Sequence, residues 1–314
     1  MTRTAIVTGG AGFIGSHVVD SLLGDGYDVI AVDDLTTGRA GNLDPQAQLA
    51  LVDITDVAAL DELFDRARPE RVFHLGAQSM VTVSVKDPAR DCEVNVRGTL
   101  NVLEAAGRHG APVVFTSTGG ALYGDRVPLP TPETQIPAPL SPYGASKWAG
   151  ESYVRTWALA GGIPHAVCRL GNVYGPRQSP HGEAGVVSIF SRLLWEGRAP
   201  SLYGFGEATR DYVHVHDVVA CLRSASGTAG VFNVATGVET SVRQVFEVLR
   251  AEAGAVIDPV LAPLREGELT RSCMDPSCAE RELGWRAHVP FAEGVRATYR
   301  ELVTEFEAEV PSCR

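Results

Sequence analysis

The sequence lacks any hydrophobic run of about 18 or more residues, the length that a membrane-spanning helix requires. Its first residues also lack the charged lead, apolar core and small-residue cleavage site of a secretory signal peptide, because Met1 to Arg3 run directly into the apolar segment 4–8. We therefore expect no membrane association, and we expect the protein to work in the cytoplasm.

Basic residues are too few for a general nucleic-acid-binding protein. The 314 residues carry 27 Lys and Arg against 38 Asp and Glu, so the formal net charge is −11 at pH 7. Nucleic-acid phosphates are bound by basic surfaces. An anionic ligand of this protein must therefore be met locally, by helix N-termini or by a few arginines.

Cysteine pairs with metal-binding or redox spacing are absent as well. The six cysteines are scattered without a C-x-x-C pair or a paired-histidine pattern (Cys92, Cys168, Cys221, Cys273, Cys278 and Cys313). Such usage predicts reduced thiols, no metal site and no disulfide framework.

What the sequence does contain is an alternation of short apolar strands with helical segments. Strands are predicted near residues 4–8, 28–32, 48–52, 71–75 and 112–116. This alternation is typical of the α/β class and of a Rossmann-type doubly wound parallel sheet. In the second half of the chain the glycines and prolines become denser and the alternation stops, which predicts a smaller C-terminal substrate-binding domain.

A glycine-rich turn follows the first strand. It contains Gly9, Gly12 and Gly15, with Phe13 and Ile14 at the start of the next helix. The first glycine permits the tight turn, the second lets the backbone approach a pyrophosphate, and the third allows close packing of helix on strand. The turn predicts a dinucleotide-binding site.

Asp33 ends the second strand, about 20 residues after the turn, where an acidic side chain binds the 2′-hydroxyl of an adenosine ribose. Its carboxylate would repel a 2′-phosphate. The sequence therefore favours NAD over NADP, although Arg39 lies near enough to work against that preference.

Further candidate cofactor contacts follow the third and fourth strands, at the carboxyl edge where such sheets bind ligands. Asp53 and Ile54 end the third strand, and Leu75 and Ala77 end the fourth. Asp53 is a candidate partner of the adenine amine. The next predicted helix carries Asn95, which we add to this set.

Tyr143 and Lys147 stand one helical turn apart, and residues i and i+4 share a helix face. A lysine cation stabilises a tyrosinate, so it should lower the pKa of Tyr143 from its usual value of about 10. Tyr143 is therefore a candidate general base, with Lys147 as its electrostatic partner. Taken alone, the pair also fits an ordinary amphipathic helix.

The chain resembles the extended short-chain dehydrogenase/reductases, and within them the nucleotide-sugar epimerases of the UDP-glucose 4-epimerase type. The resemblance covers nearly the whole chain. It rests on four segments that occur in the family's order: residues 9–15, the Tyr143/Lys147 pair, residues 171–177 (Gly-Asn-Val-Tyr-Gly-Pro-Arg) and residues 210–215 (Arg-Asp-Tyr-Val-His-Val).

The resemblance implies catalytic roles. Thr118 or its neighbour Ser117 would be the catalytic hydroxyl, Tyr143 the base and Lys147 its partner. Thr118 is preferred because its separation of 25 residues from Tyr143 matches the family's. The Gly119-Gly120 pair makes this turn one residue longer than the family's shorter form, so the choice between Ser117 and Thr118 stays open.

The resemblance also places UDP-sugar contacts at Asn172, Arg210 and Arg265, with Glu268 near the ribose. Arginine suits a diphosphate because its planar fork binds two oxygens at once. Tyr203 is a candidate to stack on uracil, although its apolar neighbours fit simple packing equally well.

On this basis we expect an NAD-binding domain in residues 1–171, joined by about 207–225. The UDP-sugar-binding domain would comprise about 172–206 and 226–314. The resemblance further implies a homodimer, in which helices near Asp91–His109 and Tyr143–Leu159 of two subunits form a bundle.

The favoured function is an NAD-dependent C4 epimerase of a UDP-hexose, acting through a transient 4-keto sugar. The substrate pair is UDP-glucose/UDP-galactose or UDP-glucuronate/UDP-galacturonate. A nucleotide-sugar 4,6-dehydratase is disfavoured, because related dehydratases carry an Asp-Glu pair directly after the catalytic Thr, where this chain has Gly119 and Gly120.

Two other functions stay open. A uronate decarboxylase begins with the same oxidation, and a 4-keto uronate loses carbon dioxide without a dedicated acid. A non-catalytic NAD-binding regulator is a third alternative, but such proteins commonly lack the tyrosine or the lysine that this chain keeps.

Arg192 bears on the choice of sugar. It shares one side of a predicted helix with Ser188. Arg192 is either a solvated surface arginine or a cation that reaches the C6 carboxylate of a uronate, which needs a partner because a desolvated unpaired charge is costly. The second interpretation predicts UDP-glucuronate as the substrate.

Overall fold

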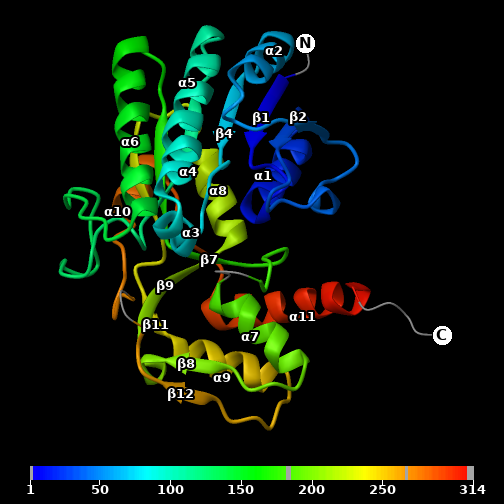
Figure 1. Ribbon diagram of the computed structural model, residues 1–314, viewed down its shortest axis with the longest axis vertical. Helices are drawn as coiled ribbons and strands as arrows, with labels where there is room; N and C mark the ends of the chain where they lie inside the picture. Colours follow the sequence, from blue (N-terminus) through cyan, green and yellow to red (C-terminus); the bar gives the residue numbers. More distant parts are fainter. Residues whose placement is uncertain (1–2, 182–184, 266–267, 310–314) are drawn as a thin grey trace.

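The computed structural model describes residues 3–181, 185–265 and 268–309. Cys313, one of the cysteines discussed above, lies outside the described residues. The chain forms two lobes, with the large parallel sheet and its helices in the upper part of Figure 1 and a smaller lobe below them.

The large lobe is built on a seven-stranded sheet in the order β10-β6-β5-β4-β1-β2-β3, in which all neighbouring strands are parallel. The order reverses beside β1, and doubly wound sheets bind ligands at the carboxyl ends of the strands next to such a reversal. The strands are β1 (Arg3–Thr8), β2 (Tyr27–Asp33), β3 (Gln48–Leu51), β4 (Arg71–His74), β5 (Val113–Thr118), β6 (Ala166–Leu170) and β10 (Gly230–Val234).

Helices cover both faces of this sheet, which explains why β1 is apolar at consecutive positions. Ala5 and Val7 belong to one buried core, and Ile6 between them belongs to the other. The first core is closed by α1 (Phe13–Gly24), α8 (Val215–Ala225) and α10 (Ser277–Leu283), and the second by α2 (Val57–Ala67), α5 (Gly98–Arg108) and α6 (Pro142–Gly161).

One helical column contains a π-helical segment that the sequence did not predict. The expected helix 91–109 is composed of α4 (Pro88–Cys92), a π-helix (Glu93–Arg97) and α5. Short π segments inside α-helices occur frequently at functional sites. This one carries Asn95, and α3 (Val81–Lys86) precedes it in the chain.

The smaller lobe has its own apolar core, which includes Phe190, Leu202, Phe246 and Leu249. It consists of the three-stranded sheet β11-β9-β7, the pair β12-β8 and three helices. The elements are β7 (Asn172–Tyr174), α7 (Val186–Trp195), β8 (Ser201–Tyr203), β9 (Thr209–His214), β11 (Glu239–Ser241), α9 (Val242–Glu252), β12 (Val260–Ala262) and α11 (Phe291–Glu309).

The parallel sheet and its two helical layers confirm the predicted α/β fold. At three points the chain is arranged differently from the expected division into domains: β10 and α10, both beyond residue 226, belong to the large lobe, and β9, expected in the NAD-binding domain, pairs with β7 and β11 in the smaller lobe. Within residues 3–181, 185–265 and 268–309, no helix combines the length and the apolar character that a membrane crossing needs.

Candidate active site

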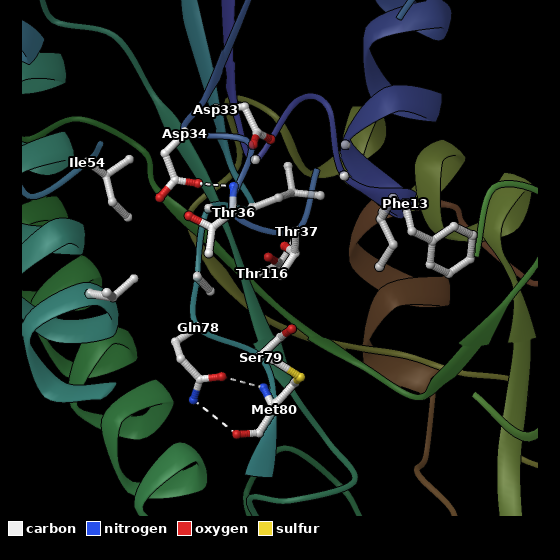
Figure 2. Close-up of a pocket in the computed structure, with 18 of the residues that line it drawn as sticks. Phe13, Asp33, Asp34, Thr36, Thr37, Ile54, Gln78, Ser79, Met80 and Thr116 are labelled. Carbon is white, nitrogen blue, oxygen red and sulfur yellow. Dashed lines mark hydrogen bonds between the residues drawn. The ribbon is translucent and has the colours of Figure 1, made fainter. Parts of the chain in front are cut away.

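A cavity of about 760 Å³ opens at the carboxyl ends of β1, β2, β4 and β5. Figure 2 shows Asp33, Asp34, Thr36 and Thr37 at one end and Gln78, Ser79 and Met80 at the other. Twelve of the expected cofactor contacts line it: Gly9, Gly12, Phe13, Ile14, Gly15, Asp33, Asp53, Ile54, Leu75, Ala77, Tyr143 and Lys147.

The glycine turn is tied to its surroundings by backbone contacts that leave no room for side chains. Gly9 has φ +67°, and a Cβ there would lie 2.7 Å from the backbone nitrogen of Gly76. A Cβ at Gly15 would collide with the carbonyl of Gly9. The N-terminus of α1, with Gly12 as its N-cap, therefore faces the cavity with exposed N–H groups, as a diphosphate requires.

Asp33 holds the glycine turn against the end of β2. Its Oδ2 accepts a hydrogen bond from the backbone N–H of Ala11 (3.0 Å), and its Oδ1 accepts one from Leu35 (2.9 Å). Burial raises the pKa of this carboxyl group, and the two backbone donors oppose that rise. Arg39 also lines the cavity, but its guanidinium pairs with Glu309 at 3.0 Å.

Asp53 and Ile54 lie on the adenosine side of the cavity, after β3. The carboxylate of Asp53 accepts hydrogen bonds from the backbone and hydroxyl of Thr55, both at 2.8 Å, and lies 3.5 Å from Arg90. Together these donors keep the pKa of Asp53 low although its partial burial works in the other direction. Arg90 was missed in the sequence because it stands on a different element from Asp53.

Asn95 lies behind the cavity wall and not on it. It is 1% exposed, its Oδ1 accepts from the backbone N–H of Gln78 (2.9 Å), and its Nδ2 donates to Ser146 Oγ (3.0 Å). Asn95 therefore joins the end of β4 to helix α6, so we expect it to act by holding the walls of the site in place.

The structure brings Thr118 next to Tyr143; the tyrosine lines the cavity, and Thr118 stands behind it. Burial raises the pKa of Tyr143 to about 12, and a hydrogen bond from Thr118 opposes that rise. Ser117 has a different environment, because it lines the cavity and its buried Oγ has no partner among the described residues. Both hydroxyls therefore remain candidates, with Thr118 the one in contact with the tyrosine.

Lys147 shares the buried face of α6 with Tyr143, as the spacing predicts. Its ammonium lies 4.6 Å from the ring centroid of Phe115, and burial lowers its pKa to about 8. The sequence predicted that the lysine would lower the pKa of Tyr143, but desolvation of the tyrosine is the largest effect and raises it. The lysine can act on the tyrosine only at pH values where it is still charged.

The expected UDP-sugar contacts form two groups. A Cβ at Gly120 would lie 3.7 Å from Oδ1 of Asn172, so this side chain faces the turn that carries Thr118. The other group lies in the smaller lobe and consists of Tyr203, Arg210, Arg265 and Glu268.

In this second group the guanidinium of Arg265 lies 3.8 Å from the ring centroid of Tyr203 and 3.6 Å from the carboxylate of Glu268. Burial lowers the pKa of Arg210, and the charge of Glu268 opposes this shift. Tyr203 thus presents a ring stacked with a cation and is not a purely apolar packing residue.

Arg192 is not brought to the cavity. Its guanidinium pairs with Glu196 at 2.6 Å and with Glu309 at 3.2 Å, and it lies over the rings of Trp195 and Phe306. These contacts join α7 to α11. The uronate interpretation needed this cation at the sugar, and we therefore withdraw Arg192 from the substrate-binding set.

Sequence reasoning missed several residues at the inner end. Gln78, Ser79 and Met80 line the cavity after β4 (Figure 2), and the side chain of Gln78 bonds to the backbone of Met80 and to Asp91. The signal was a polar residue directly after a buried strand. In the described part of the chain, no cluster of three His, Cys, Asp or Glu side chains is arranged to hold a metal ion.

Known proteins resemble the chain over almost its full length. The family model for GDP-mannose 4,6 dehydratase matches residues 6–298. The UDP-glucose 4-epimerase of Mycolicibacterium smegmatis is 46% identical over 302 residues, which cover 93% of this chain and 96% of that protein.

Two solved structures are similar as well. UDP-glucose 4-epimerase from Thermotoga maritima, solved with UDP-glucose, gives a TM-score of 0.95 at 44% identity and covers 97% of this chain and 100% of that one. The Thermus thermophilus UDP-glucose 4-epimerase in complex with NAD gives a TM-score of 0.89 at 42% identity, covering 96% and 99%.

Proposed function

Because the chain belongs to the family of the GDP-mannose 4,6 dehydratase model, within the extended short-chain dehydrogenase/reductases, we propose that it is an NAD-dependent UDP-glucose 4-epimerase. The observation that carries the proposal is the pairing of a dinucleotide-type cavity with Tyr143 and buried Lys147, which line it, and with Thr118, which hydrogen-bonds to Tyr143. The substrates would be UDP-glucose and UDP-galactose.

The cavity fits NAD by its own chemistry. At Gly9 and Gly15 the backbone packs too closely for side chains, so a ligand can approach the backbone of the turn directly. The N–H groups at the start of α1 supply donors for a diphosphate. Asp33 supplies an acceptor for a ribose hydroxyl. Arg39, the arginine that a 2′-phosphate would need, is paired with Glu309. NAD held there would supply the hydride acceptor for C4 of the sugar and, once reduced, the donor that returns the hydride.

The chain's own residues handle the proton and the position of the sugar. Tyr143 accepts the proton of the C4 hydroxyl as oxidation proceeds and gives it back to the carbonyl oxygen on reduction. Thr118 hydrogen-bonds to the tyrosine and orients it, and charged Lys147 stabilises the tyrosinate. Arg210 and Arg265 bind the diphosphate, which holds the nucleotide while the keto sugar turns its other face.

Dehydration is disfavoured by space as well as by residue type. At Gly119, where related dehydratases carry an acid, a Cβ would collide with the sulfur of Met274. Met274 is itself buried (2% exposed) and cannot simply move into solvent. No carboxylate can be placed next to Thr118 without rearranging this contact.

We also propose a homodimer in the cytoplasm, with the NAD-binding domain in residues 1–171, 215–234 and 277–285 and the UDP-sugar-binding domain in the rest. The five described cysteines are free thiols, which suits a reducing compartment. The outer face of α6 exposes apolar side chains, among them Trp148 (39%) and Leu159 (88%), as a helical subunit contact requires.

The proposal is tested by two assays on the purified protein. Denaturation should release NAD(H) into the supernatant, since an epimerase that returns the hydride to the same sugar has no need to release its cofactor. Incubation with UDP-galactose should yield UDP-glucose. A 4-keto-6-deoxy sugar would indicate a dehydratase, and an unchanged sugar would indicate a non-catalytic binding protein.

A further inference from the structure

The carboxylate of Asp91 is buried, and its charge acts on both Tyr143 and Lys147. We propose that Asp91 is a positioning residue that acts through Lys147: its carboxylate is the buried counter-charge that keeps the lysine protonated beside Tyr143. The inference rests on the roles proposed above for these two residues.

Asp91 lies at the end of α4 and is 1% exposed. Its Oδ1 accepts hydrogen bonds from Gln78 Nε2 (2.8 Å) and Asn95 Nδ2 (3.1 Å), which are both uncharged amides. Its Oδ2 is buried and has no hydrogen-bond partner among the described residues. A buried carboxylate solvated only by two amides needs a cation nearby.

The hydrogen bonds of Asn95 fix Asp91 against the functional face of α6. The same Nδ2 that donates to Asp91 donates to Ser146 Oγ (3.0 Å), and this hydroxyl donates to the carbonyl of Tyr143 (3.0 Å). Ser146 is the residue before Lys147. The charge of Asp91 accordingly acts on both Tyr143 and Lys147.

Glu151 is the other buried carboxylate that faces Lys147, but it has its own cation. Arg169 donates to both oxygens of Glu151, from Nε at 3.0 and 3.2 Å and from Nη2 at 2.7 Å, and both side chains are almost fully buried. Glu151 acts on Lys147 more strongly than Asp91 does, but its charge is already paired with that of Arg169. Of the two carboxylates, Asp91 is the one whose Oδ2 has no hydrogen-bond partner among the described residues.

The other ionisable groups around the pair cannot take this role. His74 on β4 is neutral, because burial lowers its pKa to about 3. On the column of Asp91, Arg90 pairs with Asp53 and Glu93 with Arg97, all at least partly exposed, and Lys86 on α3 is exposed. Among the described residues of these elements, Lys147 is therefore the buried cation that the charge of Asp91 can stabilise.

The causes of the pKa shifts of Lys147 and Tyr143 give the direction in which removing the charge of Asp91 should change each pKa. Burial lowers the pKa of Lys147 to about 8, and the charge of Glu151 and, after it, that of Asp91 oppose this fall. In Asp91→Asn the pKa of Lys147 should fall further, by about one unit, the size expected for one charge acting over several ångströms at an effective dielectric constant of about 20. The pKa of Tyr143 should fall too, because Asp91 raises it.

The sequence offers an unusually direct test, since it contains only two lysines, Lys86 and Lys147. In protein labelled with 13C at lysine Cε, NMR titration gives two signals, and exposed Lys86 is the internal reference. We expect the Lys147 signal to titrate about one pH unit lower in Asp91→Asn than in wild type, with no change for Lys86. Asp91→Ser, a second neutral variant, should do the same, and Asp91→Glu should not.

Asp87→Asn is the matched control, because Asp87 is exposed and caps the same short helix four residues earlier. It should leave the Lys147 signal in place. A Lys147 titration that is the same in wild type and in both neutral Asp91 variants would overturn the proposal. This readout needs no turnover, so it can fail independently of the epimerase assignment.

The pH profile of turnover supplies the functional half of the test. Both limbs of the profile should move to lower pH in Asp91→Asn, because both pKa values fall. A residue that only supports Gln78 and Asn95 would lower the rate at all pH values equally. Equal losses across the profile would therefore assign Asp91 a purely structural role and overturn the inference.

Discussion

Lys147 is buried and Tyr143 is half-buried in the cavity wall, and desolvation disfavours the charged form of each. The tyrosine can serve as a base only if several features together stabilise its anion: the Thr118 hydrogen bond, a lysine kept charged and the positive charge of the oxidised cofactor. Residue spacing alone predicted the pair, whereas the burial that dominates its chemistry depends on the packing of α6 against the sheet.

Tyr143→Phe should lower the turnover number by about two to four orders of magnitude, the usual contribution of a general base. The substitution removes one hydroxyl, so the affinity for UDP-sugar should change little. Steady-state kinetics and calorimetric titration with UDP-glucose measure the two quantities separately. Near-normal turnover in this variant would remove Tyr143 from the mechanism.

Arg192→Ala should leave sugar selectivity unchanged. The guanidinium is already held by Glu196 and Glu309 between α7 and α11, so its loss should affect stability, by about 1 kcal/mol, and not the substrate. The measurement compares kcat/KM for UDP-glucose and UDP-glucuronate in both proteins. A selective loss on the uronate would return Arg192 to the sugar site.

At the scale of elements, the first half of the chain could be predicted well. The five expected strands correspond to β1 to β5, because each is a short apolar run between helical patterns and Gly-rich turns. The π-helical segment at Glu93–Arg97 could not be predicted, since the partners of its residue Asn95, Gln78 and Ser146, come from other elements. The position of β10 in the large sheet likewise depends on long-range pairing with β6.

The candidate site could also be predicted only in part. The cofactor contacts were predicted because a glycine turn and strand-end acids are local patterns, and they line one cavity. Arg192 was misplaced because a helix pattern shows which side is apolar but not which neighbour covers the polar side. Asp91 was missed because its burial arises from α6, far away in the sequence.

Gly15→Ala tests the glycine turn. The added methyl group would collide with the carbonyl of Gly9, so we expect loss of co-purified NAD(H) and a destabilisation of about 1–3 kcal/mol. Gly24→Ala is the control on the same helix, because a Cβ there meets nothing within 4 Å. The control should keep its cofactor and unfold at the same or a slightly higher temperature; equal behaviour of both variants would contradict the packing argument.

At the scale of the whole molecule, the proposal gives the diphosphate of the UDP-sugar to a few arginines of the smaller lobe, while the large lobe holds the dinucleotide cavity (Figure 1). The apolar outer face of α6 is then left for another chain. Light scattering at micromolar concentration should give twice the chain mass of 33.4 kDa.

Trp148→Asp should shift that mass towards the monomer, because it places a charge in the proposed contact. Val256→Asp is the matched control, since Val256 is fully exposed and lies outside α5 and α6. A wild-type monomer, or the same mass change in both variants, would refute the proposed dimer face.

The central claim is that one site removes the C4 hydrogen of a UDP-hexose and returns that same hydrogen to the opposite face. The most direct measurement is incubation with UDP-galactose deuterated at C4, followed by NMR or mass analysis of the sugar. The account predicts UDP-glucose that retains deuterium at C4, in ordinary water and without added NAD. Loss of the label to solvent, or a dehydrated product in place of UDP-glucose, would contradict it.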